Sequence, residues 1–443
     1  MLAQQKNINR RRFLKHAAVA AAGMAGFPYL VPSSALGKAG SVAPSERITL
    51  GAIGLGIRGT THLRTFLPFA EAQIIAVSDL YRSRREAAKK RVEDHYARTS
   101  SAAGTYKGCD TYNDFRDLLA RKDIDAVVIA TPEHWHALTM IAAAEAGKDI
   151  YGEKALTLTI AEGRAVCDAV RRYGRVFQVG TQQRSGRNFR FACELARNGY
   201  LGKLHTVKVG VPGGHALPNS PGIPVPTGFD YDMWLGQAPV KPYNAVRCTS
   251  PEGWYHIYDY CVGWIQSWGV HHIDIALWGA PRLRTSPLEV KGTAVFPTDG
   301  LGNTSLTWRV EFAASDGLRL SFSDNSRHKQ GCRFEGDKGW VHVNRSGIST
   351  EPSSLLKAVI KPQEQHLYES NNHHANFLEC VRSRRDPAAP VEAGHAATTA
   401  TIVADIATRL GRKLTWDWKS ERFDHDDQAN RMLSRPMRSP WRL

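Results

Sequence analysis

A G-x-G-x-x-G motif at residues 54–59 is the stretch whose residue types and spacing point most directly to a chemistry. An apolar run at 48–53 precedes it, and Asp79 follows 20 residues after its last glycine, at the end of a second apolar run. Between a strand and a helix, these glycines allow a tight turn and a close approach of a pyrophosphate group. The helix N-terminus then offers unpaired N–H groups to the phosphates. The spacing predicts a dinucleotide site, with an ordinary glycine-rich turn as the alternative. The loop residues expected at the dinucleotide are Gly54, Gly56, Ile57, Arg58 and Gly59.

Asp79 also bears on which dinucleotide binds. Its carboxylate can accept hydrogen bonds from the ribose hydroxyls, and its charge would repel a 2′-phosphate. We therefore expect NAD. Arg82 and Arg84 follow closely in the sequence and keep NADP open as the alternative.

Lys154 is the expected acid–base group beside a nicotinamide. It comes at the end of the apolar stretch 149–152, and open α/β sheets bind ligands at the carboxyl ends of their strands. Oxidation of a secondary alcohol removes a hydride, which the cofactor takes, and a hydroxyl proton, which the protein must handle. A positively charged nicotinamide disfavours the ammonium form, as a general base or a hydroxyl-orienting group requires. The alternative is a surface lysine paired with Glu153.

Metal and disulfide chemistry are not expected. His271, His272 and Asp274 are adjacent enough to invite a metal site, but no further ligand has supporting spacing. Asp274 is better interpreted as a structural hydrogen-bond partner. The seven cysteines are odd in number, widely spaced and without a C-x-x-C, which is typical of buried thiols.

The elements that must position these residues change in kind along the chain. Apolar runs alternate with helical stretches from residue 48 to 180, which predicts a doubly wound parallel sheet. A long region rich in Pro, Gly, Tyr and Trp follows at 212–262. Four strand-like runs then occur in series, as in an antiparallel sheet, before two helices. These runs are 288–296, 304–313, 318–323 and 339–343, and the helices are 374–381 and 396–410.

The first 39 residues resemble a twin-arginine export signal. Arg10, Arg11 and Arg12 precede a short, weakly apolar run at 16–31. A buried helix or a membrane anchor is the alternative, although the run is short for a membrane span. The signal predicts an exported, periplasmic protein with no membrane span in its mature form.

Length, composition and charge fit a soluble globular protein. The chain has 443 residues, of which 42% are hydrophobic and 23% charged, so it can form two or three domains with real cores. The net charge of +16 comes partly from the leader and partly from a basic tail. No basic stripe lies on a recognisable nucleic-acid-binding module, so we expect no nucleic-acid partner. The expected parts are a signal at 1–39, a Rossmann domain at 45–175, an α+β domain at 176–420 and a basic tail at 421–443.

Taken together, six motifs resemble the Gfo/Idh/MocA family of glucose–fructose oxidoreductase and inositol dehydrogenase. The resemblance covers essentially everything after the leader. It implies a Rossmann domain followed by an α+β domain with an open, mainly antiparallel sheet. The six motifs are the glycine fingerprint, Thr131-Pro132 with His134 and His136, Glu153-Lys154, residues 232–239, residues 269–274 and residues 411–414.

The same resemblance implies a nicotinamide cofactor, a small sugar or polyol substrate and a homo-oligomer. It makes His271, in a G-x-H-x-I-D pattern, a second catalytic candidate, and histidine changes protonation near neutral pH. Four tryptophans in the loop-rich region are interpreted either as stacking walls for a sugar or as core residues: Trp234, Trp254, Trp264 and Trp268. The cofactor-side residues that it implies are Thr131, Pro132, His134, His136, Glu153 and Lys154. The substrate-side residues are Gln182, Trp234, Asp259, Ser267 and His272.

Two departures from the family pattern matter. Ala155 stands where Glu-Lys is usually followed by proline, which leaves the lysine in place. Ser267 stands four residues before the histidine, where many of these dehydrogenases have aspartate. A serine can neither balance an imidazolium nor take up a full proton. Asp259, Tyr258 and Tyr255 are close enough in sequence to substitute for it.

These features lead to three functional hypotheses. The first is an exported NAD-dependent oxidoreductase that acts on a sugar by hydride transfer with a tightly bound cofactor. The second is NAD-dependent glycoside cleavage through transient oxidation at C3, a chemistry outside the two-carboxylate scheme. The third, prompted by Ser267, is a non-catalytic sugar-binding or scaffold protein.

Overall fold

The computed structural model describes residues 46–99, 107–248 and 253–443. The predicted export leader at 1–39 lies outside the described residues. Among those that are described, no helix combines the length and apolar character needed to cross a membrane.

Six parallel strands form the first sheet, in the order β3-β2-β1-β4-β5-β6. Every residue of the central strands β4 and β5 is buried, as a sheet covered on both faces requires. This confirms the predicted doubly wound sheet, which runs through β6 and therefore past residue 175. The strands are β1 (Ile48–Ile53), β2 (Ala72–Ser78), β3 (Asp110–Tyr112), β4 (Ala126–Ile129), β5 (Asp149–Gly152) and β6 (Phe177–Val179).

Helices connect these strands, and local sequence sets where several begin. Asp114 caps α4 by accepting a hydrogen bond from the backbone N–H of Arg116. Thr159 and Glu162 form a reciprocal capping box at the start of α6. The helices are α2 (Ile57–Phe66), α3 (Arg82–Thr99), α4 (Phe115–Leu119), α5 (Glu133–Glu145) and α6 (Ile160–Arg172).

Nine strands form the second sheet, in the order β13-β12-β11-β7-β10-β9-β8-β14-β15. Only β7 and β10 pair in parallel, so the predicted mainly antiparallel sheet is confirmed. Alternating buried and exposed residues in β8 show that one face is covered and the other open. The strands are β7 (Leu204–Val211), β8 (Leu288–Val295), β9 (Thr307–Ala314), β10 (Arg319–Asp324), β11 (Gly331–Gly336), β12 (Gly339–Asn344), β13 (Gly347–Glu351), β14 (Leu414–Asp417) and β15 (Arg422–Phe423).

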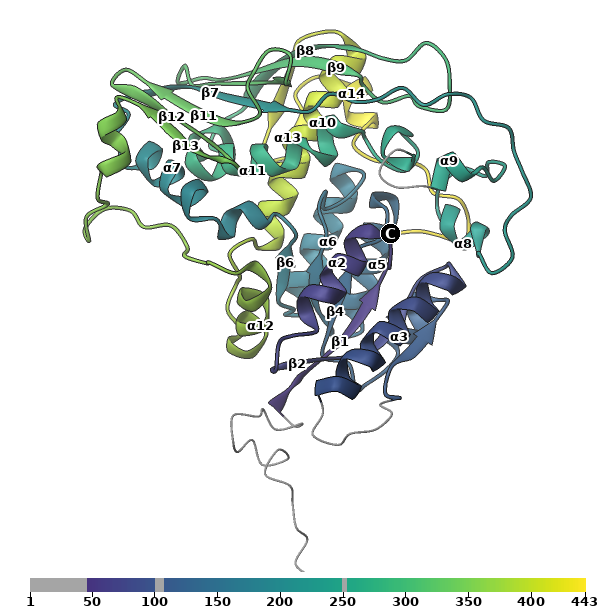
Figure 1. Cartoon of the computed structure of the whole chain (residues 1–443). Helices are drawn as coiled ribbons and strands as arrows, with labels where there is room; N and C mark the ends of the chain where they lie inside the picture. The colour runs from purple at the N-terminus through teal and green to yellow at the C-terminus, as the bar shows by residue number, and fades with distance from the viewer. Residues whose placement is uncertain (1–45, 100–106, 249–252) are drawn as a thin grey trace, which may run out of the picture. The chain divides into compact units, whose positions relative to one another are not determined.

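One long helix, α13 (Val391–Leu410), links the two sheets (Figure 1). It packs against α6 and β6 of the first domain and against β8 and α11 (Gly269–Gly279) of the second. With α7 (Arg187–Arg197), α11 also covers the buried face of the second sheet. Because α11 carries His271, this packing fixes that residue relative to the first sheet.

The C-terminal segment 421–443, which the sequence groups as a basic tail, contains β15 and α14 (Asp427–Arg431). It then contacts the loop-rich region 212–262 and, through Trp441, the first domain. Arg438 forms a 2.6 Å ion pair with Asp232, and the ring of Trp441 lies 4.8 Å from that of Trp135 on α5. The described part of this segment is therefore packed on the protein.

Candidate active site

The glycine loop joins β1 to α2, and two of its glycines are required by the space around them. Gly54 has φ +84°, and a Cβ there would lie 2.7 Å from the backbone of Ala130 at the end of β4. A Cβ on Gly59 would overlap the carbonyl oxygen of Gly54. The loop therefore folds tightly against β4 and leaves the start of α2 facing outward.

The start of α2 and Asp79 have the features that a dinucleotide needs. Gly56 is the N-cap of α2, where no side chain of the described residues caps the helix and no acidic residue lies in its first turn, so its first N–H groups are open to phosphate. Asp79 Oδ2 accepts a hydrogen bond of 2.6 Å from the Leu55 N–H, and Oδ1 accepts one of 2.8 Å from Tyr81 N–H. Burial raises the Asp79 pKa, against the lowering charge of Arg84. These residues fit NAD.

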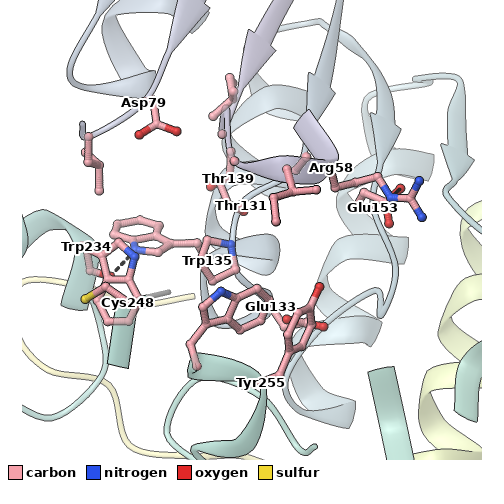
Figure 2. Close-up of a pocket in the computed structure, with 18 of the residues that line it drawn as sticks. Arg58, Asp79, Thr131, Glu133, Trp135, Thr139, Glu153, Trp234, Cys248 and Tyr255 are labelled. Atoms are coloured by element: carbon pink, nitrogen blue, oxygen red, sulfur yellow. Dashed lines mark hydrogen bonds and ion pairs between the residues drawn. The ribbon is translucent and has the colours of Figure 1, made fainter. Parts of the chain in front are cut away.

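One cavity contains both the dinucleotide loop and the predicted acid–base residues. Figure 2 shows Asp79 at one end, with Glu133, Tyr255 and Glu153 toward the other. The cofactor-side residues that line it are Gly54, Gly56, Ile57, Arg58, Asp79, Thr131, Pro132, Glu153 and Lys154. The opposite wall includes Trp234, Trp254, Tyr255, Trp264, Ser267, Trp268, His271 and Arg345. All four tryptophans considered as stacking walls are thus in the lining.

Lys154 projects from the carboxyl end of β5 toward α10 (Trp264–Ser267). Its Nζ donates a hydrogen bond of 2.9 Å to Ser267 Oγ and lies 3.1 Å from the Ser267 carbonyl oxygen. It also lies 5.7 Å from the centre of the Tyr255 ring. The lysine is therefore held by a neutral hydroxyl at the position where the family pattern has a carboxylate.

His271 lies in the first turn of α11 and is 5% exposed. Its Nδ1 has no hydrogen-bond partner among the described residues. Burial, and then the charges of Lys154 and Arg345, hold its pKa well below the usual value. The imidazole is consequently neutral at physiological pH, so it can accept a hydrogen bond but does not readily take up a proton.

Glu153 is an anion tied to the cofactor side of the site. Its Oε1 lies 2.7 Å from His62 Nε2 and 3.4 Å from Arg58 Nε. Burial would raise its pKa, but the hydrogen bond from His62 and the charges of His62 and Arg58 outweigh burial and hold it far below the usual range. Glu153 therefore positions the lysine that follows it and stays charged.

Glu133 is a site residue that sequence reasoning missed. It is the first residue of α5, is 1% exposed and lines the cavity, and neither carboxylate oxygen has a partner among the described residues. Burial raises its pKa to about 7, although Lys154 and the Ser267 hydroxyl act to lower it. Acidic residues are common in the first turn of a helix, because they interact favourably with the helix dipole. The sequence position of Glu133 therefore gave no signal of a role in the cavity.

Two histidines expected at the cofactor lie behind the cavity wall instead. His134 Nε2 is 2.9 Å from the carbonyl oxygen of Trp234. The ring nitrogens of His136 lie 2.7 Å from the carbonyl oxygen of Ala155 and 2.9 Å from that of Thr131. Both histidines are buried, outside the described lining, so they brace the turns that form the site.

Three of the residues expected at a substrate are also outside the described lining. Gln182 donates a 3.2 Å hydrogen bond to the Tyr151 hydroxyl, and His272 Nδ1 lies 3.2 Å from Gln183 Nε2. Asp259 is partly exposed. Tyr255, by contrast, faces the cavity, and its pKa is raised well above the usual value by burial and then by Glu133.

Asp274, which the sequence suggested as a metal ligand or a structural hydrogen-bond partner, is part of an ion pair. Asp274 forms a buried two-pronged ion pair with Arg184, at 2.8 Å for both contacts. In the described ranges, no cluster of three or more His, Cys, Asp or Glu is arranged to hold a metal ion. The seven cysteines are free and buried.

Two family models match the chain. Residues 48–181 match the oxidoreductase family's NAD-binding Rossmann fold, and residues 208–443, more than half the chain, match its C-terminal alpha/beta domain. A curated relative, "Glycosyl hydrolase family 109 protein" of Shewanella baltica, is 32% identical over 210 residues. That alignment covers 45% of this chain and 44% of the relative's length.

Solved structures share the fold at low sequence identity. The WlbA dehydrogenase of Chromobacterium violaceum, in complex with NADH and UDP-GlcNAcA, has a TM-score of 0.61 at 17% identity, covering 85% of this chain and 97% of that one. An aldose-aldose oxidoreductase of Caulobacter crescentus, complexed with glycerol, has a TM-score of 0.60 at 17% identity, covering 83% and 99%. With its NAD-binding Rossmann domain and its matching C-terminal domain, the chain belongs to the Gfo/Idh/MocA family of oxidoreductases.

Proposed function

We propose that this protein is an NAD-dependent oxidoreductase that oxidises a secondary hydroxyl of a sugar or sugar derivative and retains its NAD between turnovers. One observation supports the proposal above the others: the glycine loop, Asp79, Lys154 and His271 all line one cavity. Cofactor chemistry and proton handling can therefore meet at the same substrate carbon.

NAD, when bound, supplies the hydride acceptor for this reaction. Lys154 would hold the substrate hydroxyl, and the support for this role is that Ser267 fixes its Nζ from one side. His271, which its lowered pKa keeps neutral, would accept a hydrogen bond from the substrate in the same cavity. The tryptophan wall can stack on the apolar face of a sugar and keep water from the reacting carbon.

We further propose that the protein is exported already folded, with NAD in place. The support is the twin-arginine pattern of residues 10–12, because that pathway moves folded proteins. Free NAD is expected to be scarce outside the cytoplasm. A retained cofactor would then be regenerated by reduction of a second substrate rather than by exchange.

The test is to purify the exported form and release its nucleotide. We expect close to one NAD per chain, and reduction of that NAD at 340 nm by at least one member of a panel of sugars. Lys154→Met should keep the nucleotide and lose the reduction. A protein that carries no NAD and does not bind it would refute the proposal.

A second candidate is NAD-dependent glycoside cleavage, in which the hydride is returned to the sugar after bond breaking. Two observations favour it: the similarity to a glycosyl hydrolase family 109 protein, and the presence of two further acid–base groups, Glu133 and Tyr255, in the cavity. Elimination next to a transient ketone needs such groups.

Nitrophenyl glycosides distinguish the two candidates. Cleavage would release nitrophenol with no net change in the absorbance of the bound cofactor. Oxidoreductase activity would instead reduce the bound cofactor, release no nitrophenol and require a second carbonyl compound for further turnover. A nitrophenyl substrate that reduces NAD without releasing nitrophenol would exclude glycoside cleavage of that substrate.

A further inference from the structure

We propose that the carboxyl group of Glu133 takes over from the aspartate that the family pattern has at the position of Ser267. In this role Glu133 is the final acceptor of the substrate's hydroxyl proton. The inference rests on the proposed function, because it requires an alcohol to be oxidised in this cavity. It supplies a proton acceptor from a different element, the start of α5 rather than the turn before α11.

The surroundings of Glu133 are unusual for a structural residue. It is 1% exposed, and neither oxygen has a hydrogen-bond partner in the described part of the chain. Glu162, which is also buried at 3% exposed, accepts hydrogen bonds of 3.0 Å from the backbone N–H groups of Leu158 and Thr159. A buried carboxylate is costly unless donors or cations stabilise it, and the groups that do so here, Lys154 and the Ser267 hydroxyl, both line the candidate active site.

Ser267 and Lys154 connect Glu133 with the proposed place of the substrate hydroxyl. Lys154 Nζ donates to Ser267 Oγ at 2.9 Å, and the Ser267 hydroxyl and the Lys154 charge both stabilise the Glu133 carboxylate. Five side chains from neighbouring elements interact with Glu133 through charge or hydrogen bonds. They are Lys154 and Glu153 at the end of β5, Ser267 on α10, and Tyr255 and Cys261 in the segment that precedes α10.

The proton balance favours Glu133 over His271. Burial and the cations Lys154 and Arg345 hold the His271 pKa well below its usual value, so an imidazolium is a poor end point. The C–H hydride of the alcohol would go to bound NAD⁺. A proton of the Lys154 ammonium passes through Ser267 Oγ to the Glu133 carboxylate, and the resulting lysine amine takes the O–H proton of the alcohol in its place. The products would be a carbonyl compound, reduced NAD and a neutral Glu133 carboxyl group. Since it acts through Lys154 and Ser267, Glu133 is a positioning residue with a proton-accepting role.

The main experiment follows the pH dependence of bound-NAD reduction in wild type, Glu133→Gln, Glu133→Asp and the double variant Glu133→Gln/Ser267→Asp. We expect Glu133→Gln to slow reduction roughly 100-fold and to remove the rise in rate near neutral pH. Glu133→Asp should keep a shifted rise, and the double variant should recover most of the loss. An unchanged pH profile in Glu133→Gln would overturn the inference.

Glu162→Gln is the matched control, because Glu162 is also buried with a pKa raised to about 7 but lies in the capping box of α6. Glutamine preserves such a box. We expect this variant to keep the wild-type rate and the wild-type pH profile, which separates loss of a buried carboxyl from loss of this one.

A second measurement does not depend on the substrate. Calorimetry of NAD⁺ binding to the stripped protein, in two buffers of different ionisation enthalpy at pH 6.5, reports the protons released. Wild type should release part of a proton as the positive nicotinamide favours the Glu133 carboxylate, and Glu133→Gln should not. Equal release by both would overturn the inference. Normal NAD binding and proton release with no sugar able to reduce the cofactor would refute the proposed function instead.

Discussion

At the residue scale, the Asp79 carboxylate has two roles. It accepts two backbone hydrogen bonds, one from the glycine loop, and it lines the cavity where a ribose would lie. The sequence predicts the second role from spacing alone. The first depends on the turn bringing Leu55 back against the end of β2, which spacing does not reveal.

Asp79→Asn should therefore weaken NAD binding and narrow the preference over NADP. The amide offers one acceptor oxygen instead of two and removes the charge that repels a 2′-phosphate. We expect the Kd for NAD to rise about tenfold, equivalent to about 1.4 kcal/mol of binding free energy. The ratio of the Kd for NADP to the Kd for NAD should fall. Titration calorimetry with both nucleotides measures it. Asp94→Asn, on the exposed side of α3, is the control and should change neither value.

The raised pKa of Glu133 also predicts a pH-dependent stability. Its usual pKa is 4.5 and its folded value is about 7, so the folded state holds a proton that the unfolded state loses between these values. The carboxyl therefore costs stability increasingly from about pH 4.5 to pH 7.

Glu133→Gln removes this cost. In the NAD-free protein, we expect its Tm to match wild type at pH 4.5 and to exceed it by a few degrees at pH 8. Differential scanning fluorimetry across this range measures the difference. A gap between the two proteins that stays constant with pH would contradict the assignment.

At the element scale, the β1–α2 connection separates two effects of glycine. A Cβ on Gly59 would overlap the Gly54 carbonyl, whereas one on Gly56 would meet only Arg84 Nη1, at 3.8 Å. Packing of the loop against the sheet thus depends on Gly59, while Gly56 leaves room in front of the helix.

Gly59→Ala should lower both stability and NAD affinity, with a cost of about 1–3 kcal/mol from overpacking. Gly56→Ala should leave the Tm within a degree or two but weaken NAD binding, because its methyl group occupies the approach of the pyrophosphate. Thermal melts and NAD titrations of both variants measure the contrast. Equal losses of Tm would show that the loop is tight at both positions.

Most of the elements follow from periodicity, and the ones that do not have an evident cause. The apolar strands of the parallel sheet and the β7 to β10 and β12 runs are predictable. β11 and β13 are not, because β11 has only Cys332 and Phe334 as apolar side chains and β13 only Ile348, whereas β12 has Trp340, Val341 and Val343. They are strands because β7 and β12 present unpaired backbone edges to them.

At the scale of the whole molecule, the C-terminal segment contributes to the active-site wall. Trp441 packs on Trp135, which lines the cavity and donates a 3.0 Å hydrogen bond from Nε1 to the Trp234 carbonyl oxygen. The last residues of the chain therefore support a wall built by two other segments.

Trp441→Ala should lower the free energy of unfolding by about 0.5–1.5 kcal/mol for the lost aromatic pair and should also weaken NAD binding modestly. Trp340→Ala is the control: Trp340 stacks with Arg333 at 3.8 Å on the second sheet, outside the described cavity lining. It should reduce stability to a similar degree with no change in NAD affinity. Thermal melts and NAD titrations compare the two.

The sequence by itself determined the cofactor class, the two-domain α/β architecture and the candidate Lys154, because these follow from local patterns: glycine spacing, strand periodicity and strand-end position. The candidate His271 came from the resemblance of residues 269–274 to a family motif. Tertiary structure decided which residues share the cavity. It placed His134 and His136 behind the wall, left Asp259 outside the lining, and brought Glu133 beside Lys154 and Ser267. The reason is that burial and contacts between distant segments set the pKa and the partners of each group. These arise only when α5 and β5 pack against α10 and α11, which lie more than a hundred residues away in the sequence.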